Sequence, residues 1–303
     1  MVDETPIRIK GVELGQYSII ESCKIIIVVD DTPARNGALL HRHGLSILVE
    51  AASKNSKIKI LFDAGPSPGI LKYNIKALNL RLEDLDAVVL SHGHYDHTDG
   101  LPAVLRFLSR HIPVIVHPRT FDPKFAYKPN LIYIGHGLNR SLIRENGGLF
   151  VQTRTPIILV NGIKTSGEIP LETDYEKPIG FWKVEGCEFR EDHMIDEQAL
   201  IIKPKNKGLI VIAGCSHRGI VNTIRIAQRI MDENRIYAII GGFHLSQASD
   251  ELIHSTVAAL KEGASPDHIY PCHCTGIKPI KILREAFGNR CKQLITGDLV
   301  TLK

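Results

Sequence analysis

The sequence has no apolar run long enough to cross a membrane. No window of the 303 residues approaches the roughly 18 consecutive apolar residues that a transmembrane helix needs. The first ten residues include Asp3 and Glu4 and lack the apolar core of a secretory signal. We therefore expect a cytoplasmic protein with no membrane association.

The sequence also lacks a strong charge of either sign and a disulfide framework. Lys and Arg total 37 against 33 Asp and Glu, a net charge of +4, without the basic clusters of a nucleic-acid-binding surface. Six cysteines are spread over the chain, which is not the pattern of a disulfide-rich scaffold. We expect an anionic small-molecule partner and no nucleic acid, and a homo-oligomer is compatible with this composition.

What the sequence does contain is enough apolar residues, 44% of the total, for one large core. Short apolar runs and amphipathic stretches alternate over residues 45–116 and again over 209–302, which is typical of an α/β fold. Between them, from about 119 to 197, glycine, proline and charged residues break the periodicity. We interpret the chain, 1–303, as a single domain with a substrate-binding insertion at roughly 119–197.

Four expected strands end directly at polar, histidine-bearing turns. These strands span 86–90, 209–213, 237–240 and 268–270, and the histidines that follow them are His92, His217, His244 and His273. The other expected elements are strands at 45–50, 57–62, 112–116 and 293–302 and helices at 101–108, 220–231, 253–260 and 280–287. Because open α/β folds build their sites where strands end, we expect the four histidine-bearing turns to meet.

The densest cluster of candidate ligands is His92-x-His94-x-Asp96-His97. It places three imidazoles and a carboxylate within six residues, directly after a buried strand. Histidine nitrogen and carboxylate oxygen suit zinc, and also iron or manganese, and Gly93 lets the backbone fold tightly around an ion. A solvated polar turn is the alternative interpretation, but four candidate ligands at this spacing, before an amphipathic helix, favour a metal site.

This motif resembles the signature of the metallo-β-lactamase superfamily, whose αββα sandwich holds one or two metals between its sheets. The Phe-Asp-Ala-Gly sequence at 62–65 is similar to the preceding superfamily motif, in which the aspartate, here Asp63, supports the metal loop. The Tyr-Pro-Cys-His sequence at 270–273 is similar to the last ligand motif. The resemblance covers nearly the whole chain and implies one or two divalent ions, zinc first, with manganese, iron or magnesium as alternatives.

The resemblance also implies a set of metal ligands. They are His92, His94, Asp96, His97, His217 and His273. We favour His217 over His117 and His193 as the third histidine of the first metal site, because it leaves a strand end and precedes a helix, as His97 does. Cys215 stands in the place of the usual bridging aspartate, and it is either a further ligand or a small buried residue.

We expect Asp96, His217 and His244 to have catalytic roles. The resemblance implies that Asp96 orients a bound water or accepts its proton. His244 follows two glycines, which let a ligand approach the backbone closely, and we expect it to contact substrate or metal. Arg218, at a helix start, and Arg119, in the insertion, are candidates for binding a phosphate or diphosphate group.

Five further motifs resemble those of the archaeal and bacterial ribofuranosylaminobenzene phosphate–dihydropterin synthases. They lie at 43–46, 196–200, 214–219, 241–245 and 273–276. The resemblance implies a transferase of methanopterin biosynthesis, which condenses a dihydropterin diphosphate with 4-(β-D-ribofuranosyl)aminobenzene 5'-phosphate and releases diphosphate. A pterin is therefore a candidate partner.

Two alternatives remain open from the sequence. One is a metal-dependent hydrolase, such as a phosphodiesterase using a metal-bound hydroxide, since the same ligands permit transfer and hydrolysis. The other is a non-catalytic metal- or pterin-binding protein. The intact ligand cluster argues against this last alternative, because a pure binder needs no activatable water.

Overall fold

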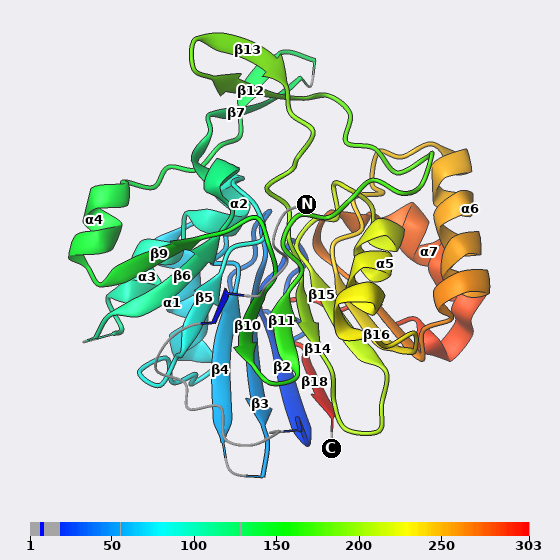
Figure 1. Cartoon of the computed structure of the whole chain (residues 1–303), viewed down its shortest axis with the longest axis horizontal. Helices are drawn as coiled ribbons and strands as arrows, with labels where there is room; N and C mark the ends of the chain where they lie inside the picture. The colour runs from blue at the N-terminus through cyan, green and yellow to red at the C-terminus, as the bar shows by residue number, and fades with distance from the viewer. Residues whose placement is uncertain (1–6, 9–18, 55, 109, 128, 303) are drawn as a thin grey trace.

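Two seven-stranded sheets lie face to face in the computed structural model, which describes residues 7–8, 19–54, 56–108, 110–127 and 129–302 (Figure 1). The first sheet has the order β18 (Leu299–Leu302), β2 (Ser22–Val29), β3 (Ser46–Ala52), β4 (Lys57–Phe62), β5 (Ala87–Val89), β6 (Ile112–Val116) and β9 (Gly148–Gln152). The second has the order β1 (Ile7–Arg8), β10 (Ile157–Val160), β11 (Ile163–Thr165), β14 (Leu200–Ile202), β15 (Leu209–Ala213), β16 (Ile236–Gly241) and β17 (His268–Pro271).

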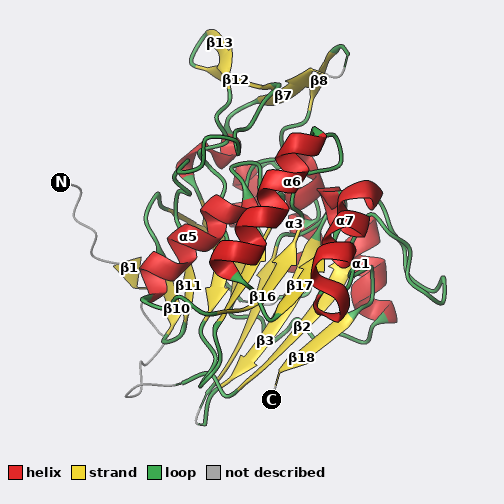
Figure 2. Cartoon of the chain, turned by 90° about the vertical axis from the view of Figure 1, so that its right-hand side faces the viewer, coloured by secondary structure: helices red, strands yellow, loops and turns green. Residues whose placement is uncertain are grey.

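Helices cover the outer face of each sheet. The first sheet is covered by α1 (Pro68–Ala77), α3 (Leu101–Leu105) and α4 (Arg140–Glu145), and the second by α5 (Ile220–Met231), α6 (Asp250–Ala259) and α7 (Ile277–Phe287). Figure 2 shows the second set of helices in front of its sheet. The layers therefore run helix, sheet, sheet, helix, as the sequence predicts.

Residues of β4 contribute to two apolar cores, one between the two sheets and one beneath the outer helices. Lys57 and Lys59 alternate with apolar residues at the start of the strand, where one face is open to solvent. Ile60 and Phe62 pack between the two sheets, whereas Leu61 packs against the helices on the outer face. Burial of both faces at the end of the strand fixes the position of Asp63, the residue that follows it.

Two elements are shorter than the sequence predicts. The helix expected over 101–108 ends at Leu105, because the next amide hydrogen bonds, from Phe107 and Leu108, reach back three residues instead of four. The last strand begins at Leu299 and not at residue 293. Gly297, whose φ is +88°, interrupts the extended backbone just before the strand.

A third, four-stranded sheet stands above the sandwich (Figure 1). It has the order β13 (Glu188–Glu191), β12 (Phe181–Glu185), β7 (Lys124–Tyr127) and β8 (Leu131–Tyr133). All four strands fall within the insertion predicted over 119–197. Strands β9, β10 and β11 also lie in that range, and they belong to the two large sheets.

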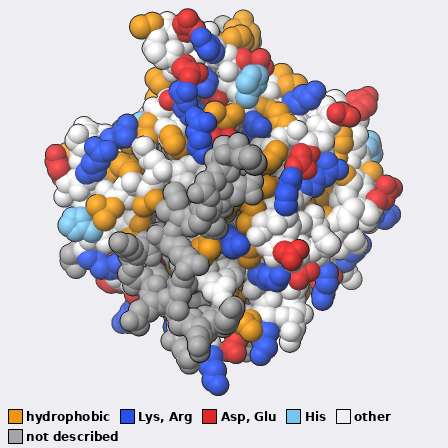
Figure 3. Space-filling model, in the orientation of Figure 1, with side chains coloured by type: hydrophobic (Ala, Val, Ile, Leu, Met, Phe, Trp, Pro, Cys, Tyr) orange, Lys and Arg blue, Asp and Glu red, His pale blue; other side chains and the backbone are white. Residues whose placement is uncertain are grey.

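The surface and the helices add two observations. On the face shown in Figure 3, positively and negatively charged side chains are interspersed. No helix among the described residues is long and apolar enough to cross a membrane.

The topology brings the ends of six strands to one edge of the sandwich. Strands β15, β16 and β17 are parallel, as are β4 and β5, and β2 runs in the same direction as β4 because each is antiparallel to β3. The polar residues that follow these strands are Asp30 and Asp31, Asp63, Ser91 and His92, Cys215, His244, and His273. Residues far apart in the chain therefore meet at this edge.

Candidate metal centre

The first cluster of possible ligands consists of His92, His94 and His217. One ring nitrogen from each of the three lies within 4.8 Å of the others, and all three side chains are buried. Nε2 of His92 is 2.9 Å from Nδ1 of His94. His217 comes from the turn after β15, so the structure brings together residues more than a hundred positions apart.

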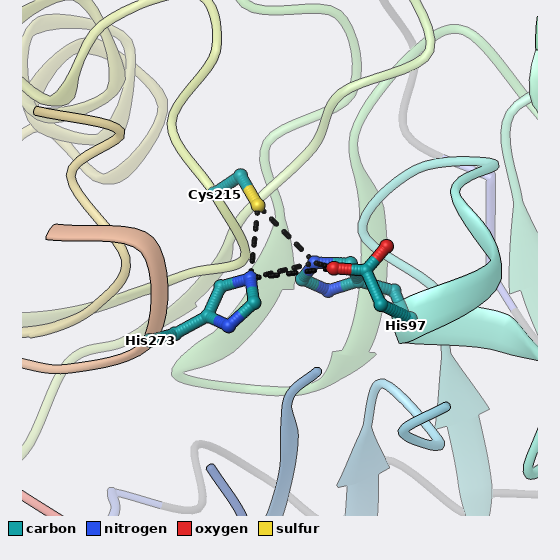
Figure 4. Close-up of side chains that lie close together, drawn as sticks. His97, Cys215 and His273 are labelled. Atoms are coloured by element: carbon teal, nitrogen blue, oxygen red, sulfur yellow. Dashed lines mark hydrogen bonds and ion pairs between the residues drawn. The ribbon is translucent and has the colours of Figure 1, made fainter. Parts of the chain in front are cut away.

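The second cluster consists of Asp96, His97, Cys215 and His273. The Sγ atom of Cys215 is 3.1 Å from Nε2 of His97 and 3.2 Å from Nε2 of His273, and these two nitrogens are 3.2 Å apart. Oδ2 of Asp96 lies 3.4 Å and 3.5 Å from the same nitrogens. Figure 4 shows the three labelled side chains pointing toward a common centre.

The two clusters are continuous with each other. Cys215 and His217, two residues apart in the chain, also form a group with His244 in which the possible ligand atoms lie within 4.8 Å of one another. Of the two alternatives for Cys215, the structure places it among the possible ligands, facing two imidazoles. His117, in contrast, pairs with Glu168 at 2.8 Å and belongs to neither cluster.

Two carboxylates orient the imidazoles of the second cluster. Oδ2 of Asp63 is 2.6 Å from Nδ1 of His97. The two carboxylate oxygens of Asp63 also accept hydrogen bonds from the amide and the hydroxyl of Ser91. Oδ1 of Asp31 is 2.7 Å from Nδ1 of His273. A carboxylate partner holds the proton on Nδ1 and leaves the lone pair of Nε2 facing the cluster, the arrangement found behind metal-binding histidines.

The arrangement of the second cluster fits a cation. With Nδ1 protonated, Nε2 of His97, Nε2 of His273, Sγ of Cys215 and a carboxylate oxygen of Asp96 bring electron pairs together at 3.1–3.5 Å. Such atoms repel one another unless a positive charge lies among them. Nitrogen, sulfur and oxygen donors in a buried group are the ligands that bind zinc and similar divalent ions.

Electrostatics differ between the clusters. Burial lowers the pKa of His92, His94 and His217 well below the usual range, and neighbouring imidazoles add to the effect for each of them. These rings therefore remain neutral near pH 7 and keep a lone pair available as a ligand. Several buried nitrogens in this region make no hydrogen bond to the described residues, among them Nε2 of His94 and both ring nitrogens of His217. Because buried polar atoms normally have a partner, these nitrogens fit a bound metal ion.

In the second cluster, nearby negative charges outweigh the effect of burial on the pKa values of the histidines. Burial lowers the pKa of His97, but the adjacent Asp96 outweighs it and holds that pKa well above the usual range. Burial also opposes protonation of His273, yet Cys274 and Asp31 raise its pKa to about 9. The charges that favour a proton on these rings would equally stabilise a divalent cation.

The loop that carries the first histidines is held by close packing. A Cβ atom on Gly93 would lie 2.0 Å from the carbonyl oxygen of Thr120, so glycine is needed there for space. The Gly93 amide donates to Asp196 at 2.8 Å. The buried ammonium group of Lys124 binds Asp196 at 2.9 Å and Asp192 at 2.6 Å. A residue of the four-stranded sheet therefore supports the metal loop.

The predicted substrate residues take different positions. His244 lies next to His217, with ring centroids 4.2 Å apart, and its Nδ1 has no hydrogen-bond partner in the described part of the chain. The guanidinium of Arg218 is buried and donates to the carbonyls of Ile169 and His193. Arg119 pairs with Asp122 and Glu185, outside both clusters.

Sequence reasoning missed three supporting residues. Asp31 and His43 were not assigned, although His43 bridges Asp31 at 2.9 Å and Asp96 at 3.3 Å. Glu197 is fully buried and accepts the amides of His217 and Arg218, both at 2.7 Å, and burial raises its pKa to about 7. The sequence offered a signal for two of the three, because His43 lies in the motif at 43–46 and Glu197 in the motif at 196–200.

Two buried sheets, helices on both outer faces and converging histidines where strands end define a metallo-β-lactamase fold. The chain belongs to the metallo-β-lactamase superfamily, and a family model described as "Beta-lactamase superfamily domain" matches residues 59–183. The prediction of this superfamily and of its fold is confirmed. The His, Asp and Cys clusters, together with a metal-dependent relative at 30% identity, point to divalent metal ions.

Similar proteins cover nearly the whole chain. The 7,8-dihydropterin-6-methyl-4-(β-D-ribofuranosyl)-aminobenzene-5'-phosphate synthase of Methanocaldococcus jannaschii is 37% identical over 93% of this chain and 97% of that protein. A solved metal-dependent hydrolase of the β-lactamase superfamily is 30% identical, with a TM-score of 0.77 over 92% of this chain and 98% of that one. Zinc-bound PqqB from Methylobacterium extorquens, at 13% identity and a TM-score of 0.52 over 92% of this chain and 99% of that one, shares the fold.

Proposed function

We propose that the protein is a metal-dependent transferase that joins a dihydropterin diphosphate to 4-(β-D-ribofuranosyl)aminobenzene 5'-phosphate, a step of methanopterin biosynthesis. The observation that carries this proposal is the 37% identity to the synthase of Methanocaldococcus jannaschii, over nearly the full length of both chains. In the reaction, the amine nitrogen bonds to the methylene carbon of the pterin. The bond from that carbon to the diphosphate oxygen breaks, and the amine loses one proton.

The two clusters would hold one or two divalent ions, for which we propose zinc. Thiolate and imidazole donors favour zinc over magnesium, and manganese and iron are the alternatives. His92, His94 and His217 would hold one ion, and the second cluster the other. Bound ions of this kind neutralise the negative charge that develops on a departing diphosphate.

His244 is our candidate for contact with the reacting amine. Its Nδ1 is buried and has no hydrogen-bond partner among the described residues, and its ring lies directly beside that of His217. An imidazole nitrogen at this position is placed to accept the proton that the amine releases. We assign Asp96 to the second ion, where His97 and His273 keep its pKa well below the usual range and its carboxylate ionised, although burial opposes this.

A metal-dependent hydrolase is the second candidate. It is supported by the solved hydrolase that is 30% identical to this chain and superimposes with a TM-score of 0.77. The donor clusters serve both reactions, because a metal centre can stabilise a leaving group or activate water.

One experiment separates these candidates. The metal-loaded protein is incubated with the dihydropterin diphosphate, with and without the arylamine, and diphosphate release is measured. Release that depends on the amine, with formation of the coupled product, supports the transferase. Release without the amine, or rapid cleavage of bis-p-nitrophenyl phosphate, supports the hydrolase and contradicts our proposal.

Matched variants connect the activity to the clusters. His92→Ala and Asp96→Ala should abolish activity and lower the bound metal measured by elemental analysis. His254→Ala provides the control, because His254 is exposed on α6 and belongs to neither cluster. Full activity in both cluster variants would show that the site is assigned wrongly.

A further inference from the structure

A pocket of about 390 Å³ opens beside the first cluster. It lies between the segment 176–181 and α6, and His217 and His244 form part of its wall. Figure 1 shows the loop before β12 reaching across to α5 and α6. Two hydrogen bonds hold this loop in place, since the Glu176 carboxylate accepts the amides of Val221 and Asn222 at the start of α5. The volume is in the range of small-molecule sites.

The interior of the pocket is largely apolar, with one unsatisfied hydroxyl. Phe243 and Leu252 line it. Thr256, which is only 1% exposed, also lines it, and its Oγ1 atom has no hydrogen-bond partner within the described residues. Buried hydroxyl groups are normally hydrogen-bonded, so this atom indicates a polar group that a ligand would bring.

Phe181 joins the pocket to the first cluster. This residue begins β12 of the four-stranded sheet, and its ring centroid lies 4.7 Å from that of His217 and 5.7 Å from that of His244. At the rim, the side chain of Ile179 is 82% exposed. A flat ring entering the pocket would cover Ile179 and contact Phe181, with its reacting substituent directed at the histidines.

We propose that this pocket binds the bicyclic heteroaromatic ring of the substrate, a pterin, and that the Thr256 hydroxyl recognises the ring edge farthest from the reacting methylene. This proposal rests on the transferase function proposed above. A pterin carries amide and amino groups on that edge, which can pair with a hydroxyl. In the aminobenzene substrate the amine must sit at the reacting carbon and the opposite position carries the ribofuranosyl group, so its ring offers no amide or amino group there.

Binding of 6-hydroxymethylpterin to the metal-loaded protein tests the proposal. The probe is fluorescent and carries no diphosphate, so it binds without reacting. Thr256→Val should weaken its binding about tenfold, the effect of one lost hydrogen bond, whereas Thr256→Ser keeps a hydroxyl and should bind as the wild type does. Leu252→Trp, which fills the pocket from a partly exposed face of α6, should abolish saturable binding.

Two controls make the result decisive. Ala258→Trp adds the same ring on the exposed side of α6, outside the pocket, and should leave probe binding unchanged. Circular dichroism verifies that each variant is folded. Unchanged probe affinity in folded Leu252→Trp would overturn the assignment. So would a loss of 4-aminobenzoate binding, without a loss of pterin binding, in the same variant.

The failure of this proposal can be distinguished from failure of the transferase function. If the probe binds through Thr256 and Leu252 but no amine-dependent diphosphate release occurs, the pocket assignment stands and the reaction is wrong. If the reaction occurs but Leu252→Trp leaves the KM for the pterin diphosphate unchanged, the pterin binds elsewhere.

Discussion

The two donor clusters differ in the groups that form hydrogen bonds with the ring nitrogens of their histidines. In the second cluster, Asp63 and Asp31 each hold an Nδ1 atom, at 2.6 Å and 2.7 Å. In the first, Nδ1 of His92 faces the Ser91 hydroxyl at 2.8 Å instead of a carboxylate, and both ring nitrogens of His217 lack partners among the described residues. Neighbouring acidic groups therefore raise the pKa values of the second cluster's histidines, whereas burial lowers those of the first.

This difference separates two tasks within one site. Fixed tautomers and nearby negative charge preorganise the second cluster for a tightly held cation. The first cluster is neutral, and His217 lies on the wall of the pocket beside it. We infer that an ion in the first cluster is more weakly held and more directly exposed to substrate.

The strongest test removes one ligand from each cluster. His217→Ala and His273→Ala should each lower activity on the order of a thousandfold, since a Lewis acid supplies several kcal/mol of transition-state stabilisation. Their metal contents should differ. His217→Ala should keep the second cluster's ion, while His273→Ala should lose it, as measured by elemental analysis after dialysis against a weak chelator. Identical metal loss in both variants would mean that the clusters bind as one unit.

Most of the side chains in the two clusters could be selected from the sequence, because they follow directly after recognisable strands. Four ligands lie in one segment of six residues, and the strands before His217 and His273 are short apolar runs that end at polar turns. Parallel strands bring such ends to one edge, so the convergence could be predicted without a structure.

The supporting contacts could not be predicted in the same way. Asp31 precedes His273 by 242 residues, and no local pattern announces that pair. The direction of a long side chain is also not encoded locally, and Arg218, a candidate for phosphate, instead donates to the carbonyls of Ile169 and His193. The pairing of β9, β10 and β11 with the two large sheets could not be predicted either, because it depends on partners that are distant in the sequence.

Asp63→Asn should weaken metal binding at the second cluster by about 10- to 100-fold, the usual effect of removing a carboxylate behind a ligating histidine. An amide can no longer hold the proton on Nδ1 of His97 with a charged acceptor. Competition with a chromophoric chelator measures the affinity of each site. Asp84→Asn removes a surface carboxylate that pairs with Lys59 and is the matched control. An equal effect on both clusters would contradict the division between them.

Cys215→Ser tests whether the thiol belongs to the metal site, and we expect a loss of affinity of about tenfold at the second cluster because a hydroxyl is the poorer zinc ligand. In the cobalt-substituted protein, the charge-transfer band of a thiolate ligand should disappear. Cys274→Ser makes the same change at a neighbouring buried thiol and should retain the band. The opposite pattern would assign the thiolate to Cys274, whose pKa is held well below the usual range by Cys215 and His273 although burial raises it.

The smallest effect is expected where support reaches the first cluster only through the backbone. Asp196→Asn retains an oxygen that can accept the Gly93 amide but loses the charge that pairs with Lys124. Because the loop keeps this hydrogen bond, metal affinity at the first cluster should fall only a few-fold, by less than the effect of Asp63→Asn on the second. Lys124→Met instead leaves the buried carboxylates of Asp192 and Asp196 without a cationic partner and should lower the free energy of unfolding by about 3–5 kcal/mol, as measured by denaturant titration. If Asp196→Asn weakened metal binding as much as Asp63→Asn does, the first cluster would depend on a nearby charge as strongly as the second. The two clusters would then differ only in the positions of their ligands.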